Sequence, residues 1–305
     1  MRHLWYILIG FLLVSCRIGE DQETNEQIGP LHIVTTTGII EDCVTQIAGD
    51  SMEVTAIMGP GTDPHIYKPT PGDIELLDEA DIIIANGLHL EGKMSEMLEK
   101  YSKEKPVLFV ADGIPESDII KSADFQDAND PHIWFDPSIW MKGMKYIAEE
   151  LGKIDTASAE YYMINYNVYN LEVMEVDTWI DNQLKSMETR PILVTSHDAF
   201  SYFGRRYNVQ VEGIQGISTL SEVGLKEISE MVDFVIDNKV KAIFTETSTS
   251  NKTAQSIVDG CKDKRYDLQI RGPLYSDALG EPDSEAGTYI GMIRENVVMI
   301  LEGLK

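Results

Sequence analysis

Two near-identical short loops contain the histidines of this chain that are best placed to do chemistry. Residues 63–67 read DPHIY and residues 130–134 read DPHIW, so His65 and His132 each follow an Asp-Pro pair. Proline fixes its own φ and favours an extended residue before it, so each loop presents its histidine from a stiff backbone. An imidazole held in this way is a candidate metal ligand.

Two further candidates follow predicted strands in the second half of the chain. His197 comes directly after residues 191–196 (PILVTS), and Asp277 follows residues 269–275 (QIRGPLY). Ligands of open parallel sheets bind at the carboxyl ends of the strands, and His65 also follows a strand-like segment. Three imidazoles and one carboxylate match the coordination of a first-row divalent metal.

Each of these residues also has an ordinary explanation. A histidine in a loop usually binds no metal, and an aspartate before a small residue usually belongs to a turn or a helix cap. The chain contains no closely spaced Cys or His-x-x-x-His zinc pattern, so the four residues would have to meet through the fold. His89 is expected near the same cleft rather than as a ligand. Glu246 ends residues 240–246 (VKAIFTE) and is either an acceptor that orients an imidazole or a satisfied strand-end carboxylate.

The elements that must position these residues alternate between strand-like and helix-like segments. Near-continuous apolar strands separated by helices predict parallel sheets that are covered on both faces. Strands are expected over 31–37, 52–58, 81–86, 106–110, 191–196, 210–213, 240–246 and 268–274, with helices near 39–49, 72–80, 91–103, 198–207, 222–238, 251–263 and 284–304.

One long helix is predicted between the two halves. Residues 156–188 contain no Gly or Pro, and apolar residues from Tyr162 to Met187 recur at steps of three and four. At 1.5 Å per residue such a helix would be about 50 Å long, enough to run beside both halves. We therefore expect an N-terminal lobe at 30–142, a linking region at 143–189 and a C-terminal lobe at 190–305.

The first residues indicate export. Residues 1–15 carry one basic residue and an apolar run too short to span a bilayer, which is typical of a signal peptide. They end in Leu-Val-Ser before Cys16, which resembles the lipobox of bacterial lipoproteins, and residues 16–29 are a polar tether. The alternative is an ordinary secretory signal whose last residue happens to be a cysteine.

Composition excludes several classes of protein. The chain of 305 residues has 25 basic and 51 acidic residues and a net charge of −26, which argues against binding nucleic acid or an anionic membrane surface. Its three cysteines are too few for a disulfide scaffold, and Cys43 and Cys261 are expected to be buried thiols rather than a disulfide. No nucleotide-binding P-loop or Gly-x-Ser-x-Gly elbow is present.

Taken together, the motifs resemble the metal-specific solute-binding proteins of ABC transporters, the zinc, manganese and iron type called cluster A-I or family 9. The resemblance covers about residues 30–305 and is carried by the lipobox, the two Asp-Pro-His loops, residues 86–91 (NGLHLE), 195–203 (TSHDAFSYF), 246–248 (ETS) and 272–279 (GPLYSDAL). It is strongest to members with three His and one Asp ligand.

The resemblance implies a fold and a function. It implies two four-stranded α/β lobes joined by a long helix, with His65, His132, His197 and Asp277 as ligands of Zn²⁺ or Mn²⁺, or alternatively Fe²⁺. The protein would be a monomer in the bacterial envelope, attached to a membrane only through lipid on Cys16, that delivers metal to an ABC permease and catalyses no reaction. The alternatives are a zinc metalloenzyme and a surface adhesin.

Two departures from the family leave the metal undecided. Dedicated zinc members often carry a His-rich loop before the second histidine, but residues 111–129 contain no histidine. Manganese members typically have Glu where this chain has His197. Because imidazole suits zinc better than a carboxylate does, His197 is expected to favour zinc.

Overall fold

The structure, a computed structural model, describes residues 29–122, 128–187 and 190–304. The expected signal peptide and Cys16 lie outside these ranges, as does the tether except for its last residue. Within the described residues, no helix combines the length and apolar character needed to cross a membrane.

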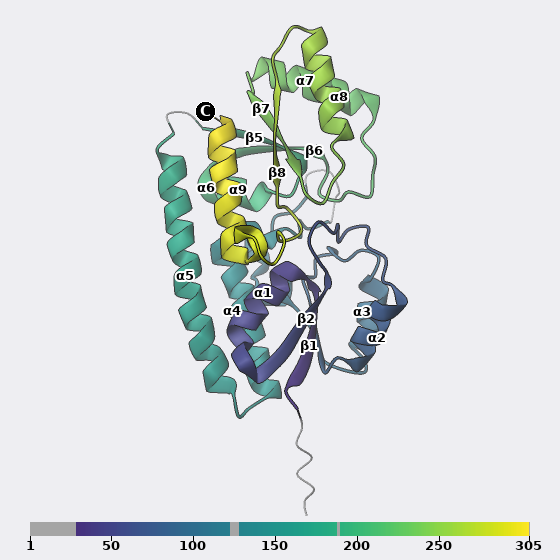
Figure 1. Cartoon of the computed structure of the whole chain (residues 1–305), viewed down its shortest axis with the longest axis vertical. Helices are drawn as coiled ribbons and strands as arrows, with labels where there is room; N and C mark the ends of the chain where they lie inside the picture. Colours follow the sequence, from purple (N-terminus) through teal and green to yellow (C-terminus); the bar gives the residue numbers. More distant parts are fainter. Residues whose placement is uncertain (1–28, 123–127, 188–189, 305) are drawn as a thin grey trace, which may run out of the picture.

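Two parallel four-stranded sheets form two lobes that lie one above the other in Figure 1. The N-terminal sheet has the order β2-β1-β3-β4 and the C-terminal sheet has the order β6-β5-β7-β8. The strands are β1 (Leu31–Thr37), β2 (Met52–Met58), β3 (Ile82–Ala85), β4 (Val107–Phe109), β5 (Ile192–His197), β6 (Gln210–Gln215), β7 (Ala242–Glu246) and β8 (Gln269–Leu274). The predicted α/β class is confirmed.

Helices pack on the faces of both sheets and connect their parallel strands. They are α1 (Gly38–Ala48), α2 (Pro71–Glu79), α3 (Ser95–Tyr101), α4 (Pro137–Ile154), α5 (Ala159–Lys185), α6 (Ser201–Tyr207), α7 (Leu225–Asp237), α8 (Lys252–Asp263) and α9 (Tyr289–Leu304). Local sequence sets their starts. For example, Thr70 and Asp73 form a reciprocal capping box at the start of α2, with Pro71 in its first turn.

Helix α5 runs along one side of both lobes (Figure 1). The predicted apolar stripe is buried from Tyr162 to Leu184, whereas Met187 lies beyond the end of the helix. The helix has 27 residues and is therefore about 40 Å long, shorter than predicted. It begins late because Asp155 ends α4 and forms a turn, in which its carboxylate accepts hydrogen bonds from the Ala157 N–H and the Tyr162 hydroxyl.

Other predicted helices also begin later in the structure, and the largest shifts are those of α3 and α9. Helix α3 begins at Ser95 rather than 91 because the Glu91 carboxylate is buried and accepts the N–H groups of Asn86 and Gly87. Helix α9 begins at Tyr289 rather than 284, after a short 3₁₀ turn. For α3, contacts of the Glu91 carboxylate override a pattern that looks helical.

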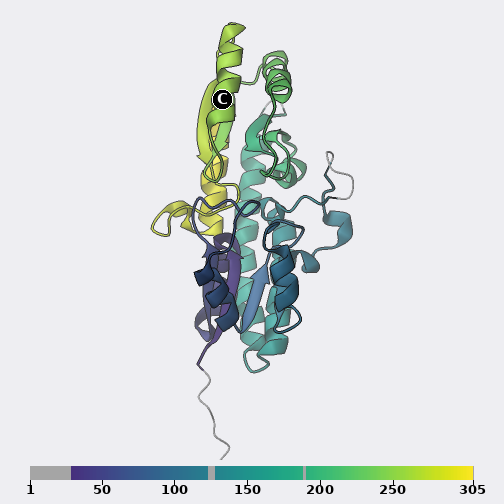
Figure 2. The ribbon, with the colours of Figure 1, turned by 90° about the vertical axis from the view of Figure 1, so that its right-hand side faces the viewer.

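One hydrophobic core extends through both lobes. A single cluster of buried side chains contains Ile33 of β1, Trp140 of α4, Tyr166 of α5, Phe244 of β7 and Tyr289 of α9. Two smaller clusters of buried side chains pack against the sheets, one cluster in each lobe. In the side view of Figure 2 the lobes again lie one above the other, and this shared core joins them. The lobes are therefore packed together rather than linked only by a flexible segment.

Cys43 and Cys261 are both free and buried. The Trp140 indole N–H donates to the sulfur of Cys43 over 3.2 Å, and burial raises the pKa of this thiol. Cys261 lies in α8 within the other lobe. The prediction of two buried thiols is confirmed.

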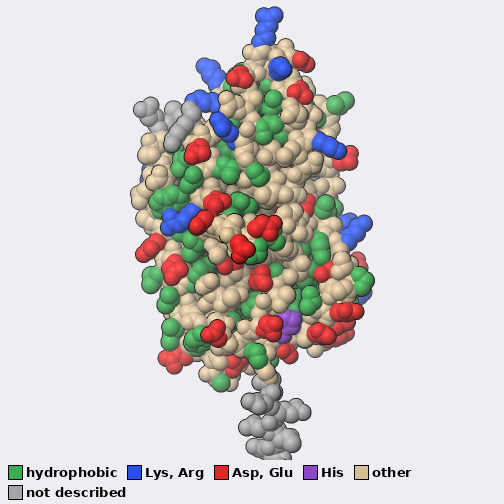
Figure 3. Space-filling view, in the orientation of Figure 1, with side chains coloured by type: hydrophobic (Ala, Val, Ile, Leu, Met, Phe, Trp, Pro, Cys, Tyr) green, Lys and Arg blue, Asp and Glu red, His purple; other side chains and the backbone are tan. Residues whose placement is uncertain are grey.

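Among the charged side chains on the face of the molecule drawn in Figure 3, most are acidic. They are spread over both lobes, whereas the lysine and arginine side chains visible there lie mainly in the upper, C-terminal lobe. This distribution agrees with the strongly negative net charge of the chain.

Candidate metal centre

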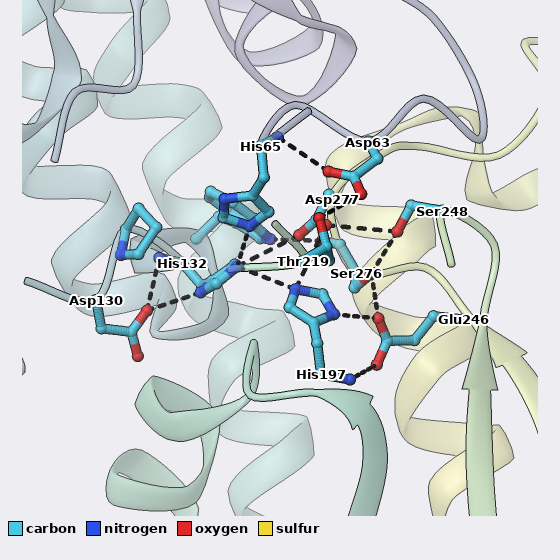
Figure 4. A network of polar contacts seen from close by, with 12 residues as sticks. Asp63, His65, Asp130, His132, His197, Thr219, Glu246, Ser248, Ser276 and Asp277 are labelled. Atoms are coloured by element: carbon cyan, nitrogen blue, oxygen red, sulfur yellow. Dashed lines mark hydrogen bonds and ion pairs between the residues drawn. The ribbon is translucent and has the colours of Figure 1, made fainter. Parts of the chain in front are cut away.

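The fold brings all four candidate ligands to one point between the lobes. His65 follows β2 and His132 precedes α4 in the N-terminal half, whereas His197 is the last residue of β5 and Asp277 follows β8. All four are buried, and one ligand atom from each lies within 4.8 Å of the others (Figure 4). The carboxyl ends of strands from both sheets therefore contribute to a single cluster.

The spacing of the ligand atoms matches a small coordination sphere. The Nε2 atom of His132 lies 3.3 Å from Nε2 of His65 and 3.2 Å from Nε2 of His197. The Asp277 oxygens lie 3.5 Å from His132 Nε2 and 3.4 Å from His197 Nε2. A tetrahedral ion with metal–nitrogen bonds of about 2.0–2.1 Å holds its ligands about 3.3–3.4 Å apart. These four separations therefore fit an ion such as zinc, and the remaining pairs of ligand atoms lie within 4.8 Å.

Asp130 orients the ring of His132. Its Oδ1 accepts the backbone N–H of His132 over 2.9 Å and the ring Nδ1–H over 2.8 Å. A proton held on Nδ1 leaves the lone pair on Nε2, which is the atom that faces the other ligands. This contact fixes both the tautomer and the direction of the ring.

Glu246 does the same for His197. Its Oε1 accepts the backbone N–H of His197 over 3.0 Å, and its Oε2 contacts ring Nδ1. The Ser276 hydroxyl donates to the same Oε2 over 2.9 Å. Burial alone would lower the pKa of His197, but the carboxylates of Glu246 and Asp277 outweigh burial and raise it well above the usual value.

Asp277 has an oxygen that no hydrogen bond satisfies. Its Oδ2 accepts a long 3.4 Å hydrogen bond from the Ser248 hydroxyl, whereas the buried Oδ1 has no hydrogen-bond donor. Burial works against its charge, but His197, His132 and His65 together hold its pKa well below the usual range. A buried, ionised carboxylate with a free oxygen beside imidazoles suits a cation.

His65 is held ready as a neutral ligand. Burial lowers the pKa of its ring to about 3, although the nearby Asp277 opposes that effect. Its backbone N–H donates to Asp63 Oδ1 over 2.9 Å. An imidazole that stays unprotonated keeps a lone pair available for a metal.

His89 lies beside the cluster and is not part of it. It lines a cleft of about 1280 Å³ that also reaches His65 and passes between the lobes. This position agrees with the expectation that His89 lies near the cleft without being a ligand.

Two contributors to the site were not singled out from the sequence. The sequence identifies Asp130 only as the start of an Asp-Pro-His loop, and it predicts no separate role for Ser276 within residues 272–279. The available signal is an aspartate two residues before the histidine, but Asp63 has the same spacing and contacts the backbone of His65 rather than its ring. The motif alone therefore could not separate the two roles.

Comparisons with known proteins agree on one family. The model of the family "ZnuA: Zinc-uptake complex component A periplasmic" matches residues 33–303. The manganese-binding lipoprotein MntA of Bacillus subtilis (strain 168) is 38% identical over 296 residues, which cover 97% of this chain and 96% of the relative.

A treponemal relative is similar in both sequence and structure. The zinc-binding protein TroA of Treponema pallidum (strain Nichols) is 38% identical over 275 residues, which cover 89% of this chain and 88% of the relative. A solved structure of the periplasmic zinc-binding protein TroA from Treponema pallidum superposes with a TM-score of 0.87 at 37% identity, covering 90% of this chain and 99% of that structure. The resemblance to metal-specific solute-binding proteins is confirmed, and the chain belongs to the family of periplasmic zinc-uptake components A.

Proposed function

We propose that this protein captures a divalent transition metal between its lobes and delivers it to an ABC permease for uptake. The observation that carries the proposal is the buried ring of His65, His132, His197 and Asp277, to which both lobes contribute. The metal is a cargo that must be bound and released. Since two ligands come from each half of the chain, bound metal is expected to stabilise the protein by holding the lobes together.

Zinc and manganese are the proposed cargoes, with Fe²⁺ as a further alternative. The two relatives named above are equally identical to this chain, yet one is named for manganese and the other for zinc. Overall sequence identity therefore does not indicate which metal this protein binds. The donor set favours zinc in vitro, because zinc outranks manganese at nitrogen and oxygen sites and three imidazoles suit a tetrahedral ion.

A transport role fits the site better than catalysis. A catalytic zinc keeps three protein ligands and an open position for water, whereas four protein ligands meet here. We therefore propose that the protein is not an enzyme. The site offers no specific support for an adhesin either.

The proposed setting is the outer side of a bacterial cytoplasmic membrane or the cell surface. The body would be a monomer attached through lipid on Cys16, with the cognate permease as its protein partner. We propose that its lobes span residues 30–142 and 190–305 and that residues 143–189 link them. These proposals rest on the sequence motifs and on the family.

The test is metal binding by the purified body of the protein. Protein prepared without chelator should contain about one equivalent of zinc or manganese, and titration should show one tight site. His132→Ala and Asp277→Ala should abolish tight binding, and His89→Ala is the matched control that should leave it unchanged. Wild-type protein that binds neither metal, or ligand variants with wild-type affinity, would refute the proposal.

A further inference from the structure

The ring of ligands opens on one side to the cleft between the lobes. Of the four ligands, His65 is the one that lines this cleft. One wall comes from the N-terminal lobe and includes Leu88 and His89. The opposite wall includes residues 215–218, 220 and 221 of the C-terminal lobe. Metal that leaves on this side must therefore pass between His65 and the 215–221 segment.

The carboxylate of Asp63 joins those two walls. Asp63 Oδ1 accepts the backbone N–H of His65 over 2.9 Å, and Asp63 Oδ2 accepts the hydroxyl of Thr219 over 2.6 Å (Figure 4). Thr219 belongs to the 215–221 segment of the other lobe. The loop that carries His65 is thus tied directly to the opposite side of the cleft.

The second Asp-Pro-His loop shows that this contact is not a general property of the motif. Asp130 uses Oδ1 for both the backbone and the ring of His132, and its buried Oδ2 has no hydrogen-bond partner. Asp63 contacts no imidazole ring, and its second oxygen reaches across the cleft to Thr219. The two copies of the motif therefore have different roles. Asp130 orients the ring of His132, and Asp63 connects the loop that carries His65 to the other lobe.

We propose that Thr219 is a positioning residue that slows metal release by holding the 215–221 segment against the His65 loop through Asp63. This inference rests on the proposed function, because it concerns how the same site keeps its cargo. The hydroxyl of Thr219 has to leave Asp63 before the two walls can separate beside His65. Thr219 is not one of the four ligands, so its effect is on the opening of the cleft and not on the coordination of the metal.

The size of the effect follows from the kind of hydrogen bond. A hydroxyl that donates to an ionised carboxylate contributes more than a neutral pair, and its loss corresponds to roughly a 10- to 100-fold change in an equilibrium or a rate. If the bond must break before release, most of that change should fall on the dissociation rate.

The experiment compares metal release from wild type, Thr219→Val and Thr219→Ser. Valine keeps the shape and removes the hydroxyl, whereas serine keeps the hydroxyl. Zn²⁺-loaded protein is mixed with excess EDTA in a stopped-flow instrument, and Ser221→Ala is the control for a hydroxyl removed from the same segment. Release should be roughly 10-fold or more faster from Thr219→Val, and close to wild type from Thr219→Ser and Ser221→Ala.

Two further measurements distinguish a positioning role of Thr219 from structural damage caused by the substitution. The visible spectrum of the Co²⁺-loaded Thr219→Val protein should match wild type, because the ligands are unchanged, and the metal-free variant should unfold at the wild-type temperature. If Thr219→Val does not fold, Thr219→Ala takes its place. Wild-type release from the valine variant, equally fast release from the serine variant, or an altered Co²⁺ spectrum would overturn the inference. Wild-type protein that binds no Zn²⁺ would instead refute the proposed function.

Discussion

Glu246 accepts hydrogen bonds from both the backbone and the ring of His197, although 49 residues separate them in the chain. The two residues end neighbouring strands, β5 and β7, of the C-terminal sheet. The pairing of those strands therefore aligns a carboxylate with the imidazole that it orients. A proton held on Nδ1 leaves Nε2 free to face the other ligands.

Removing the charge of Glu246 is expected to weaken metal binding. In Glu246→Gln the amide can still accept the His197 N–H, but it no longer stabilises the ring that faces the metal. Loss of such a partner typically costs about 10- to 100-fold in metal affinity. Competition with a chelator measures the change, and Glu222→Gln, an exposed carboxylate of the same lobe, is the control. Wild-type affinity in Glu246→Gln would mean that Glu246 only completes the end of its strand.

Much of this arrangement could be anticipated from the sequence, because it depends on local patterns. Buried parallel strands produce short β-branched runs, and the carboxyl ends of such strands are where ligands gather. These two patterns are enough to predict that His65, His197 and Asp277 lie at strand ends. The stripe of α5 was predictable for the same reason, since it repeats every three to four residues.

Contacts between distant segments could not be anticipated in this way. Asp63 and Asp130 begin near-identical loops, yet one contacts Thr219 of the other lobe and the other contacts the ring of His132. The late start of α3 has a similar origin, because the buried carboxylate of Glu91 accepts N–H groups from a preceding loop. In each case the partner is chosen by packing, which a local pattern does not contain.

Metal affinity is expected to fall as pH decreases. The pKa of His65 is lowered to about 3, so this ring needs no deprotonation near neutral pH. The pKa of His197 is raised, so in the metal-free protein its ring keeps a second proton up to a higher pH, and the metal must displace that proton before Nε2 can bind it. Affinity should therefore decrease by up to about tenfold per pH unit below that raised pKa.

Calorimetry in buffers with different ionisation enthalpies would measure the proton released at each pH. Glu246→Gln should release less, because the carboxylate that raises the His197 pKa is gone. Affinity that is constant from pH 8 to pH 5.5 would contradict the prediction.

Replacement of His197 by a carboxylate is expected to reduce the preference for zinc over manganese. A carboxylate is a harder ligand that can bind through two oxygens, which favours the higher coordination numbers of manganese. The structure adds a condition, because a carboxylate at this position would face Glu246. The informative protein is therefore the double variant His197→Glu, Glu246→Gln, which avoids two like charges. Competitive titration with Zn²⁺ and Mn²⁺ measures the ratio, with Glu246→Gln alone as the control. A zinc preference that grows in the double variant, or a wild type that prefers manganese, would show the reasoning to be wrong.

Attachment to the membrane is expected to depend on Cys16. Cys16→Ser should release the protein into the soluble fraction, because a lipobox cysteine carries the lipid. Thr24→Ala, in the same expected tether, should leave the protein in the membrane fraction. Fractionation of cells that express each form provides the measurement. Membrane retention of Cys16→Ser would point to an uncleaved signal segment or to a second anchor.

Metal binding is expected to change the overall shape of the protein only slightly. Helix α5 contacts both lobes: the Tyr169 hydroxyl donates to Asp42 of α1, and Asp177 accepts hydrogen bonds from Arg206 and Tyr207 of α6. The core is also continuous between the lobes. A wide opening would have to bend α5 or break these buried contacts, and packed interfaces resist gradual deformation. We therefore expect small lobe tilts rather than hinge motion.

A break in α5 between its two sets of contacts should remove this restraint. Glu172 is exposed and lies between Tyr169 and Asp177, so Glu172→Pro would kink the helix there without deleting a buried side chain. Solution scattering of wild type with and without Zn²⁺ should give nearly equal radii of gyration, and so should the control Glu172→Ala. The proline variant should show a larger decrease when metal binds, because its metal-free lobes are free to separate. A large metal-dependent decrease already present in wild type would mean that the shared core does not hold the lobes together, and that capture of metal occurs by closure of an open form.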